Sequence, residues 1–256
     1  MSVFSKKQNL KPAIDILKKA IEDSYRALDP DVEIKEEEAI LKIVYAVIWF
    51  SFKKILFFTF TRKTLVSKLD GYRGFIAPIS QTQKTAYIYK TSVVDSLSAA
   101  FISTNWSQSS SWASGRYPYE FIVRATINGE SKTLFLLNIH AKALSDVDSY
   151  NRRFDDIAEL KDLLYAQRSA SNLIFMGDFN CPQSHTVFAP LKKMGYSSSL
   201  VNQKTSLRQK CIQNDCLASE YDTMFFNPQK IKIIQSGVIP FYKNFVFVHC
   251  FLFWQN

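Results

Sequence analysis

The chain has 256 residues, of which 47% are hydrophobic, and a formal net charge of +9 at pH 7. So large an apolar fraction excludes disorder along the whole chain. The length allows one large domain or two small ones, and we expect one domain over residues 1–256. The positive charge suits a polyanionic partner such as nucleic acid, or an anionic membrane surface. The alternative is that the basic residues serve only solubility.

The sequence shows no targeting or zinc-binding pattern. Residues 1–11 are polar and lack the apolar centre of a signal peptide, so the default expectation is a cytoplasmic protein. The four cysteines form no Cys-x-x-Cys pair, which argues against a zinc site. Residues 43–60 are strongly apolar, but Lys53-Lys54 divides them into stretches shorter than the ~20 residues of a membrane helix. We interpret them as two buried strands, with membrane contact as the alternative.

The N-terminal third predicts helices first and strands later. A helix opens at Lys11-Pro12, where proline suits a first turn, and ends before Asp29-Pro30. We interpret the acidic run 36–38 as a solvated helix start and not as a metal ligand. The elements expected next are a short helix over 64–69, a turn over 70–74, strands at 75–77 and 85–90, and a loop over 103–115.

The middle of the chain predicts a hairpin followed by a crossover. Asn128-Gly129 separates apolar runs at 120–127 and 133–139, which is a strong hairpin pattern. A helix then begins at Asp148-Ser149, and the next strand is the apolar run 173–176. The expected buried face of the helix is Phe154, Ile157, Leu160 and Leu164, and Asp155, Asp156, Lys161 and Asp162 lie mostly elsewhere.

Strand–helix–strand order predicts a crossover that places 133–139 and 172–176 in one sheet. His140 and Asp178 then lie at the same carboxyl edge, which is where open sheets bind ligands. Further on we expect a short helix from Ser184 or His185 to Met194, an irregular segment over 197–220, and strands at 221–226 and 230–238.

Asp178 and Asn180 follow the apolar run 173–176, just beyond Gly177. In an extended chain, residues two apart face the same way. A carboxylate and an amide placed together suit Mg²⁺ and a phosphate-bound water. The alternative is an Asx-type turn that ends the strand.

Gly-Asp-Phe-Asn at 177–180 and Asn-Ile-His at 138–140 resemble the endonuclease/exonuclease/phosphatase superfamily, the DNase-I-like metal-dependent phosphodiesterases. The resemblance covers about residues 64–240. It implies an α/β fold, a four-layer sandwich of two packed mixed β-sheets flanked by helices. It also implies a divalent-metal-dependent phosphodiester hydrolase, in the first place a deoxyribonuclease-like endonuclease. That enzyme would be a monomer that uses Mg²⁺, or Mn²⁺ or Ca²⁺, on nucleic acid, most readily DNA.

The resemblance also implies roles for individual residues. Asp178 and Asn180 would handle metal, water and phosphate, and His140 would contact the scissile phosphate or act as an acid–base group. Asp222 matches the Asp that orients a second histidine. Arg116, followed closely by a proline, matches an Arg that approaches the phosphate backbone. Asn138 would bind substrate or only support the strand end.

Both ends of the chain depart from the family pattern. The family closes with Ser-Asp-His, whereas His249 follows Val248 in an apolar run. The family's metal-binding Glu follows a Gln at a strand end, and residues 48–54 contain no acidic residue. A missing carboxylate weakens Mg²⁺ binding, and a missing acid–base group removes ~10²–10⁴-fold in rate. The alternatives are therefore an impaired relative that only binds nucleic acid, or a phosphomonoesterase or lipid phosphodiesterase on the same fold.

Overall fold

The computed structural model describes residues 47–53, 70–79, 83–105, 111–127, 130–168, 172–212 and 215–231, and positions 233, 236 and 238. The chain divides into two compact units, one of residues 34–238 and one of residues 1–33 with 239–256, and all described residues belong to the first. The expected single domain stays a prediction. The features that lie outside the described residues are the helices expected at 12–28 and 64–69, the acidic run 36–38, the strand expected at 55–60, and His249.

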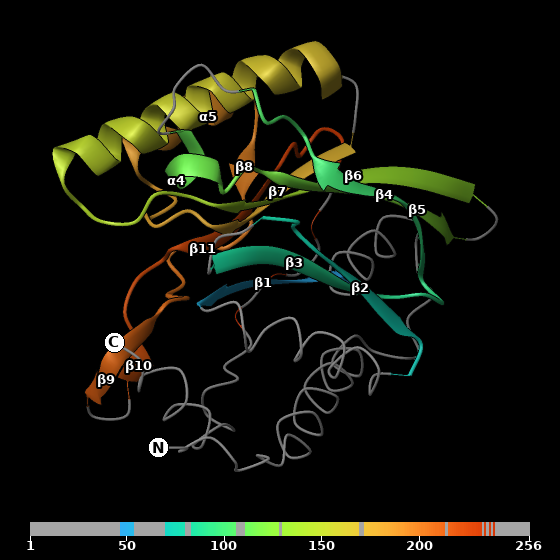
Figure 1. Cartoon of the computed structure of the whole chain (residues 1–256), viewed down its shortest axis with the longest axis horizontal. Helices are drawn as coiled ribbons and strands as arrows, with labels where there is room; N and C mark the ends of the chain where they lie inside the picture. The colour runs from blue at the N-terminus through green and yellow to red at the C-terminus, as the bar shows by residue number, and fades with distance from the viewer. Residues whose placement is uncertain are drawn as a thin grey trace, which may run out of the picture. The chain divides into compact units, whose positions relative to one another are not determined.

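The described strands form two main β-sheets and one small sheet (Figure 1). The three-stranded sheet has the order β1-β3-β2, with β1 (Val47–Lys53), β2 (Tyr72–Ile76) and β3 (Gln83–Lys90). The six-stranded sheet has the order β4-β5-β6-β7-β11-β8, with β4 (Val94–Phe101), β5 (Tyr119–Ile127), β6 (Glu130–His140), β7 (Asn172–Asp178), β8 (Ser197–Ser198) and β11 (Asp222–Phe226). The small sheet pairs β9 (Leu207–Ile212) with β10 (Asp215–Leu217).

The described helices connect these strands. They are α4 (Ser111–Gly115), α5 (Val147–Arg168), the 3₁₀ turn η1 (Thr186–Phe188) and α6 (Ala189–Lys193). Within the described ranges, no helix is both long and apolar enough to cross a membrane.

The hairpin and the crossover predicted from the sequence are both present. β5 and β6 pair antiparallel from Ile127↔Glu130 to Tyr119↔Asn138, which leaves two residues between the strands, as the Asn-Gly pair predicts. After α5 the chain returns in β7, which pairs with β6 in parallel. The strand–helix–strand reading of the sequence is thereby confirmed.

Hydrophobic side chains cover both faces of the six-stranded sheet. One face packs on the three-stranded sheet through a cluster rich in aromatic rings, in which Phe121 lies 5.0–5.4 Å from Phe75, Tyr87 and Tyr89 between ring centroids. The other face carries α5 (Figure 1). Residues such as Ile139 and Leu160 pack together there. Two packed sheets with helices on one outer face confirm the predicted α/β sandwich. The prediction of helices on the outer face of the three-stranded sheet concerns residues outside the described ranges.

Tyr87 and Asn138 make hydrogen bonds across the interface between the two sheets. The Tyr87 hydroxyl from β3 lies 2.7 Å from the Tyr119 carbonyl oxygen and 2.8 Å from that of Leu136. The Asn138 side-chain amide donates to the Ala86 carbonyl oxygen over 3.1 Å. Burial of the phenol raises the pKa of Tyr87, so it remains a neutral donor. Directional bonds therefore supplement the aromatic packing.

Several expected elements differ from the structure. β4 was not predicted, because its apolar residues do not alternate regularly. The expected loop 103–115 ends in the short helix α4, and the expected irregular segment 197–220 contains β8, β9 and β10. The turn expected over 70–74 is shorter, because β2 already begins at Tyr72. The expected strand 230–238 is wrong at its described positions, where Lys230 lies in a turn and the rest have no regular structure.

The buried face of α5 is also different from the predicted one. Ile157, Leu160 and Leu164 are buried as expected, but Phe154 is 39% exposed. Asp156, which we expected away from that face, is only 2% exposed, and Arg153 is 4% exposed. Arg153 donates to the carbonyl oxygens of Lys142 and Leu144, both at 2.7 Å. α5 therefore meets the sheet with polar as well as apolar residues, because backbone groups there need partners.

Candidate active site

Three polar residues meet side by side at one edge of the six-stranded sheet. His140 ends β6 and is the register partner of Asp178, which ends the parallel strand β7. Asp222 begins the antiparallel strand β11 and is in turn the register partner of Asp178. The chain thus brings residues from positions 140, 178 and 222 onto adjacent strands at the carboxyl edge predicted from the sequence.

His140 lies between a cation and an anion. Its Nε2 is 2.9 Å from Arg116 Nη1 and 3.8 Å from Asp178 Oδ2. A guanidinium has no acceptor, so the bond from Arg116 requires Nε2 to be unprotonated, with the ring proton on Nδ1. An ion pair with Asp178 requires the proton on Nε2. The same nitrogen cannot serve both at once, so a proton on Nε2 would break the bond from Arg116 and favour the contact with Asp178.

A left-handed turn immediately precedes Arg116. Trp112 and Ala113 have φ values of 51° and 50°, and the Arg116 amide donates to the Trp112 carbonyl oxygen. Left-handed conformations cost L-residues about 1–2 kcal/mol each, so the surrounding structure must hold this turn in place. Arg116 itself is 9% exposed, and burial lowers its pKa while the nearby Asp178 raises it.

The segment from Asp178 to Asn180 has features of both arrangements expected from the sequence, a pair of metal ligands and an Asx-type turn. The Asn180 amide donates to Asp178 Oδ1 over 2.9 Å, which is an Asx-type bond. Asn180 adopts φ 53°, a left-handed conformation that asparagine tolerates. Its Nδ2 donates to the Ala141 carbonyl oxygen over 3.0 Å, so the amide oxygen is the atom left to bind a cation. The turn thus fixes the Asp178 carboxylate and the Asn180 side chain at the same strand end.

Gly177 makes the close approach of β6 and β7 possible at this edge. A Cβ at this position would lie 2.0 Å from the Ile139 carbonyl oxygen, and φ is 136°. No side chain fits between the strands there. Glycine is therefore required for the register that sets His140 beside Asp178.

Asp222 is a buried carboxyl group at the start of β11. Its backbone amide donates to Thr205 Oγ1 over 2.7 Å. Burial raises the pKa of Asp222, and a hydrogen bond from the Thr205 side chain opposes the rise. The second histidine that the resemblance implies for Asp222 would have to come from outside the described residues, so this role stays a prediction.

Asn138 lies one layer deeper than the other candidates. Its side chain is 1% exposed and donates to Ala86, as described above. Its Oδ1 would lie 3.0 Å from a Cβ on Gly177. This position suits the supporting role, and contact with substrate stays a prediction.

The donor set at this edge fits part of a magnesium site. Asp178 and Asn180 supply hard oxygen donors, and Mg²⁺ commonly takes one or two protein oxygens while keeping waters and binding substrate phosphates. Within the described ranges, no group of three or more His, Cys, Asp or Glu residues could hold a metal ion. β1 has the sequence VIWFSFK and brings no carboxylate.

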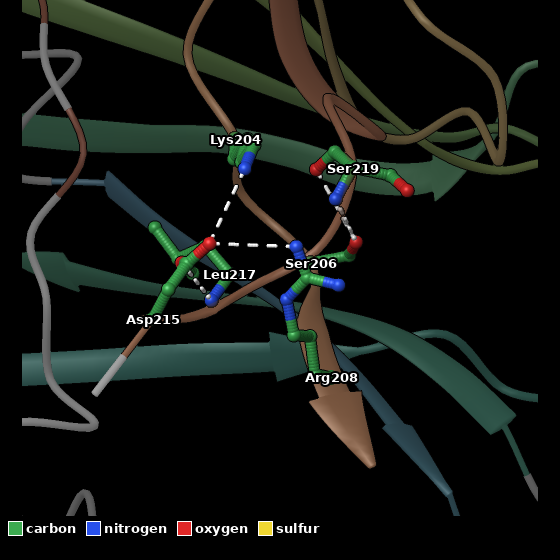
Figure 2. Close-up of polar contacts among 6 residues, drawn as sticks. All are labelled: Lys204, Ser206, Arg208, Asp215, Leu217 and Ser219. Atoms are coloured by element: carbon green, nitrogen blue, oxygen red, sulfur yellow. Dashed lines mark hydrogen bonds and ion pairs between the residues drawn. The ribbon is translucent and has the colours of Figure 1, made fainter. Parts of the chain in front are cut away.

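A second charged cluster lies on the small sheet of β9 and β10 (Figure 2). Asp215 Oδ2 lies 3.4 Å from both Lys204 Nζ and Arg208 Nη2, and Asp215 Oδ1 accepts the Leu217 amide at 3.1 Å. That amide bond, followed by the two cations, lowers the pKa of Asp215. The side chains of Lys204 and Asp215 are almost half exposed, so this cluster is solvated.

Comparisons with known proteins establish the fold. No protein-family model matches the chain, and no curated protein matches it in sequence. Among solved structures, an endonuclease/exonuclease/phosphatase from Bacteroides vulgatus is similar, with a TM-score of 0.57, 12% identity, and coverage of 86% of this chain and 80% of that one. A family member from Bacteroides thetaiotaomicron gives a TM-score of 0.51 at 12% identity, covering 87% and 79%. Humanized D. rerio TDP2 gives 0.50 at 16% identity, covering 87% and 82%.

The chain has the endonuclease/exonuclease/phosphatase fold. On this fold, the structure brings together four of the residues predicted from the sequence: Arg116, His140, Asp178 and Asn180. Asp222 joins them through strand register. The sequence analysis missed Trp112, Arg153 and Asp156, which lie behind this group. Positions 149, 153, 156, 160 and 164 follow helical spacing, but three of the five are polar, so hydrophobicity does not mark them.

Proposed function

We propose that this chain is a divalent-metal-dependent phosphodiester hydrolase with nucleic acid, in the first place DNA, as its substrate. One observation carries the proposal: His140, Asp178 and Asp222 are register partners at the carboxyl ends of β6 and β7 and the start of β11. The net charge of +9 favours a polyanion as the substrate.

The residues at this edge can divide the chemistry among them. Asp178 and the amide oxygen of Asn180 would hold the ion, which when bound neutralises charge on the phosphate. Arg116 would bind a phosphate oxygen, because guanidinium groups pair strongly with phosphate. When Arg116 turns to the phosphate, Nε2 of His140 is released to take up a proton. Asp178, at 3.8 Å, then stabilises the imidazolium.

Cleavage of supercoiled plasmid with Mg²⁺ tests the proposal, with Asp178→Asn compared against Asp162→Asn. Asp162 is an exposed carboxylate of α5 paired with Lys161, so its substitution should leave the rate unchanged. Loss of the Asp178 charge should lower the rate by at least ~10²-fold, the size of effect expected for one group that stabilises transition-state charge. The proposal is wrong if the unsubstituted protein, with Mg²⁺ or Mn²⁺, leaves plasmid, oligonucleotide and bis-nitrophenyl phosphate intact.

A second candidate is a relative that binds nucleic acid without cleaving it. The observation that favours it is the lack of a carboxylate on β1 together with the lack of a three-ligand cluster in the described part of the chain. Anisotropy of a labelled oligonucleotide in EDTA distinguishes the two. This candidate requires binding that survives Asp178→Asn, with no metal-dependent cleavage in either protein.

A further inference from the structure

We propose that Asp156 is a positioning residue for Arg116, and that it acts by anchoring the left-handed turn from Trp112 to Gly115. The proposal rests on the proposed function in assigning Arg116 to the phosphate. The physical link from α5 through this turn to His140 stands on geometry alone.

The first step of the link is a forked hydrogen bond. The Trp112 amide lies 3.0 Å from Asp156 Oδ1 and 3.1 Å from Oδ2. Asp156 is 2% exposed and Trp112 is fully buried, so water does not compete for this bond. A buried hydrogen bond is electrostatically stronger than one exposed to water. Asp156 therefore fixes the backbone at the start of the turn.

The second step is the turn itself. The φ values of Trp112 and Ala113 are both left-handed, and the Arg116 amide closes the turn on the Trp112 carbonyl oxygen at 2.6 Å. Strained non-glycine residues persist only where their surroundings hold them, and they gather at functional sites. Asp156 holds the amide of Trp112 while Arg116 holds its carbonyl, so both ends of the same residue are fixed.

The third step is the side chain of Arg116, which leaves this turn and reaches Nε2 of His140 at 2.9 Å. The backbone amide of Arg116 is hydrogen-bonded directly to Trp112, the anchored residue. If the anchor is lost, the turn can relax toward a right-handed conformation, which changes the direction in which the Arg116 side chain departs. His140 and the phosphate then lose their guanidinium donor.

The surroundings of Asp156 make this carboxyl costly to keep. Its pKa is raised to about 7, mainly by burial and also by Glu159 and Asp155, whereas the bond from Trp112 and the charge of Arg152 act to lower it. From α4 the facing group is the uncharged amide of Trp112. A buried carboxyl with so little compensation is the kind of local conflict that proteins retain at functional sites.

Nuclear magnetic resonance tests the link without requiring activity. The probes are the Arg116 Nε–H signal, assigned by its loss in Arg116→Lys, and the ring nitrogens of His140. Asp156→Asn, which keeps the shape but replaces one of the two acceptor oxygens by a nitrogen that cannot accept, should shift both. The exposed control Asp162→Asn should shift neither. A folded Asp156→Asn protein with both signals unmoved overturns the proposal, whether or not the chain cleaves DNA.

A double-substitution cycle tests the functional part in plasmid cleavage. Asp156→Asn should lower kcat by about 10-fold with little change in KM, and it should have almost no further effect in an Arg116→Lys background. Equal effects in both backgrounds would show that Asp156 acts independently of Arg116 and would overturn the proposal. Absence of cleavage in the unsubstituted protein contradicts the proposed function and leaves the resonance result to decide the positioning role.

If Asp156→Asn does not fold, the unsubstituted protein still gives an answer. The Trp112 amide and Arg116 Nε–H signals should move together in one pH step as Asp156 titrates. Independent movement of the two signals, or no movement, overturns the link.

Discussion

The strand-end site and the β9–β10 hairpin place the same kinds of charged group in two different environments. At the strand ends, Arg116 and Asp178 flank His140 in a region where His140 is 7% exposed and Asp178 is 24% exposed. At the hairpin, Arg208 of β9 and Lys204, which precedes β9, share the exposed Asp215 (Figure 2). Burial strengthens electrostatic interactions and also penalises unpaired charge, whereas water screens an exposed pair. The first arrangement can drive chemistry, and the second can be changed at little cost.

The largest expected effect is at Gly177, because the buried arrangement at the strand ends depends on it. Gly177→Ala forces a Cβ to within 2.0 Å of the Ile139 carbonyl oxygen at a φ of 136°. We expect a loss of several kcal/mol in the free energy of unfolding, enough to unfold a domain of ordinary stability, because backbone atoms on both strands must move.

The matched control is Gly71→Ala, where φ is also positive at 77° but nothing lies within 4 Å of the added Cβ. Only the conformational cost of about 1 kcal/mol should remain there. Urea denaturation measures both. Equal losses at the two glycines would mean that the tight β6–β7 approach is not what Gly177 provides.

The pH dependence of stability sharpens the comparison through two aspartates with opposite shifts. The pKa of Asp156 is raised to about 7 in the folded state, so the folded chain holds this proton while the unfolded chain releases it. Between about pH 4 and pH 7, the stability therefore falls with rising pH, by at most about 4 kcal/mol from this group. Asp156→Asn removes that slope, so the variant gains stability relative to the unsubstituted protein across this window.

Asp215 has the opposite sign. Its pKa is lowered, so its contribution to stability is present above its unfolded pKa and is lost as the pH falls through the folded one. Asp215→Asn should therefore change the profile only below about pH 4. Urea midpoints measured from pH 3 to pH 8 for both variants give the slopes. A flat difference for Asp156→Asn between pH 4 and pH 7 would contradict the assignment of a buried, protonated carboxyl.

A pair of arginine-to-lysine substitutions gives the smallest effects. Arg116→Lys keeps the charge but loses the planar fork, and we expect kcat/KM for plasmid cleavage to fall by about 10- to 100-fold. Arg208→Lys should change kcat/KM by less than about twofold, because its partner Asp215 is exposed. If Arg208→Lys has the larger effect, the hairpin and not the strand end supplies the important arginine.

The sequence predicted the strand-end site because local patterns and topology agree there. Apolar runs that end in His140 and Asp178, with a helical period between them, require a parallel pair, and the register follows once both strands end at one edge. The Asn-Gly turn specified the β5–β6 hairpin in the same way. In each case a short-range pattern carried the information.

The support behind the site could not be predicted by the same means. Ser149, Arg153 and Asp156 lie on the buried side of α5, and a polar residue there looks like a solvent-facing one when hydrophobicity is the criterion. Phe154 was assigned to the core for the converse reason, yet it is 39% exposed and stacks on Tyr150. The left-handed turn at Trp112 and Ala113 involves residues with no preference for positive φ, so only tertiary contacts specify it.

The Tyr87 hydroxyl has a mechanical consequence for the interface between the sheets. It has one hydrogen and two carbonyl oxygens, those of Tyr119 and Leu136, within 2.8 Å. Aromatic rings pack at several offsets with similar energies, so a purely aromatic interface resists sliding only weakly. The phenol of Tyr87 lies between the carbonyl oxygens of two strands of the other sheet. A slip of one sheet along the other would therefore break its hydrogen bond inside an apolar core.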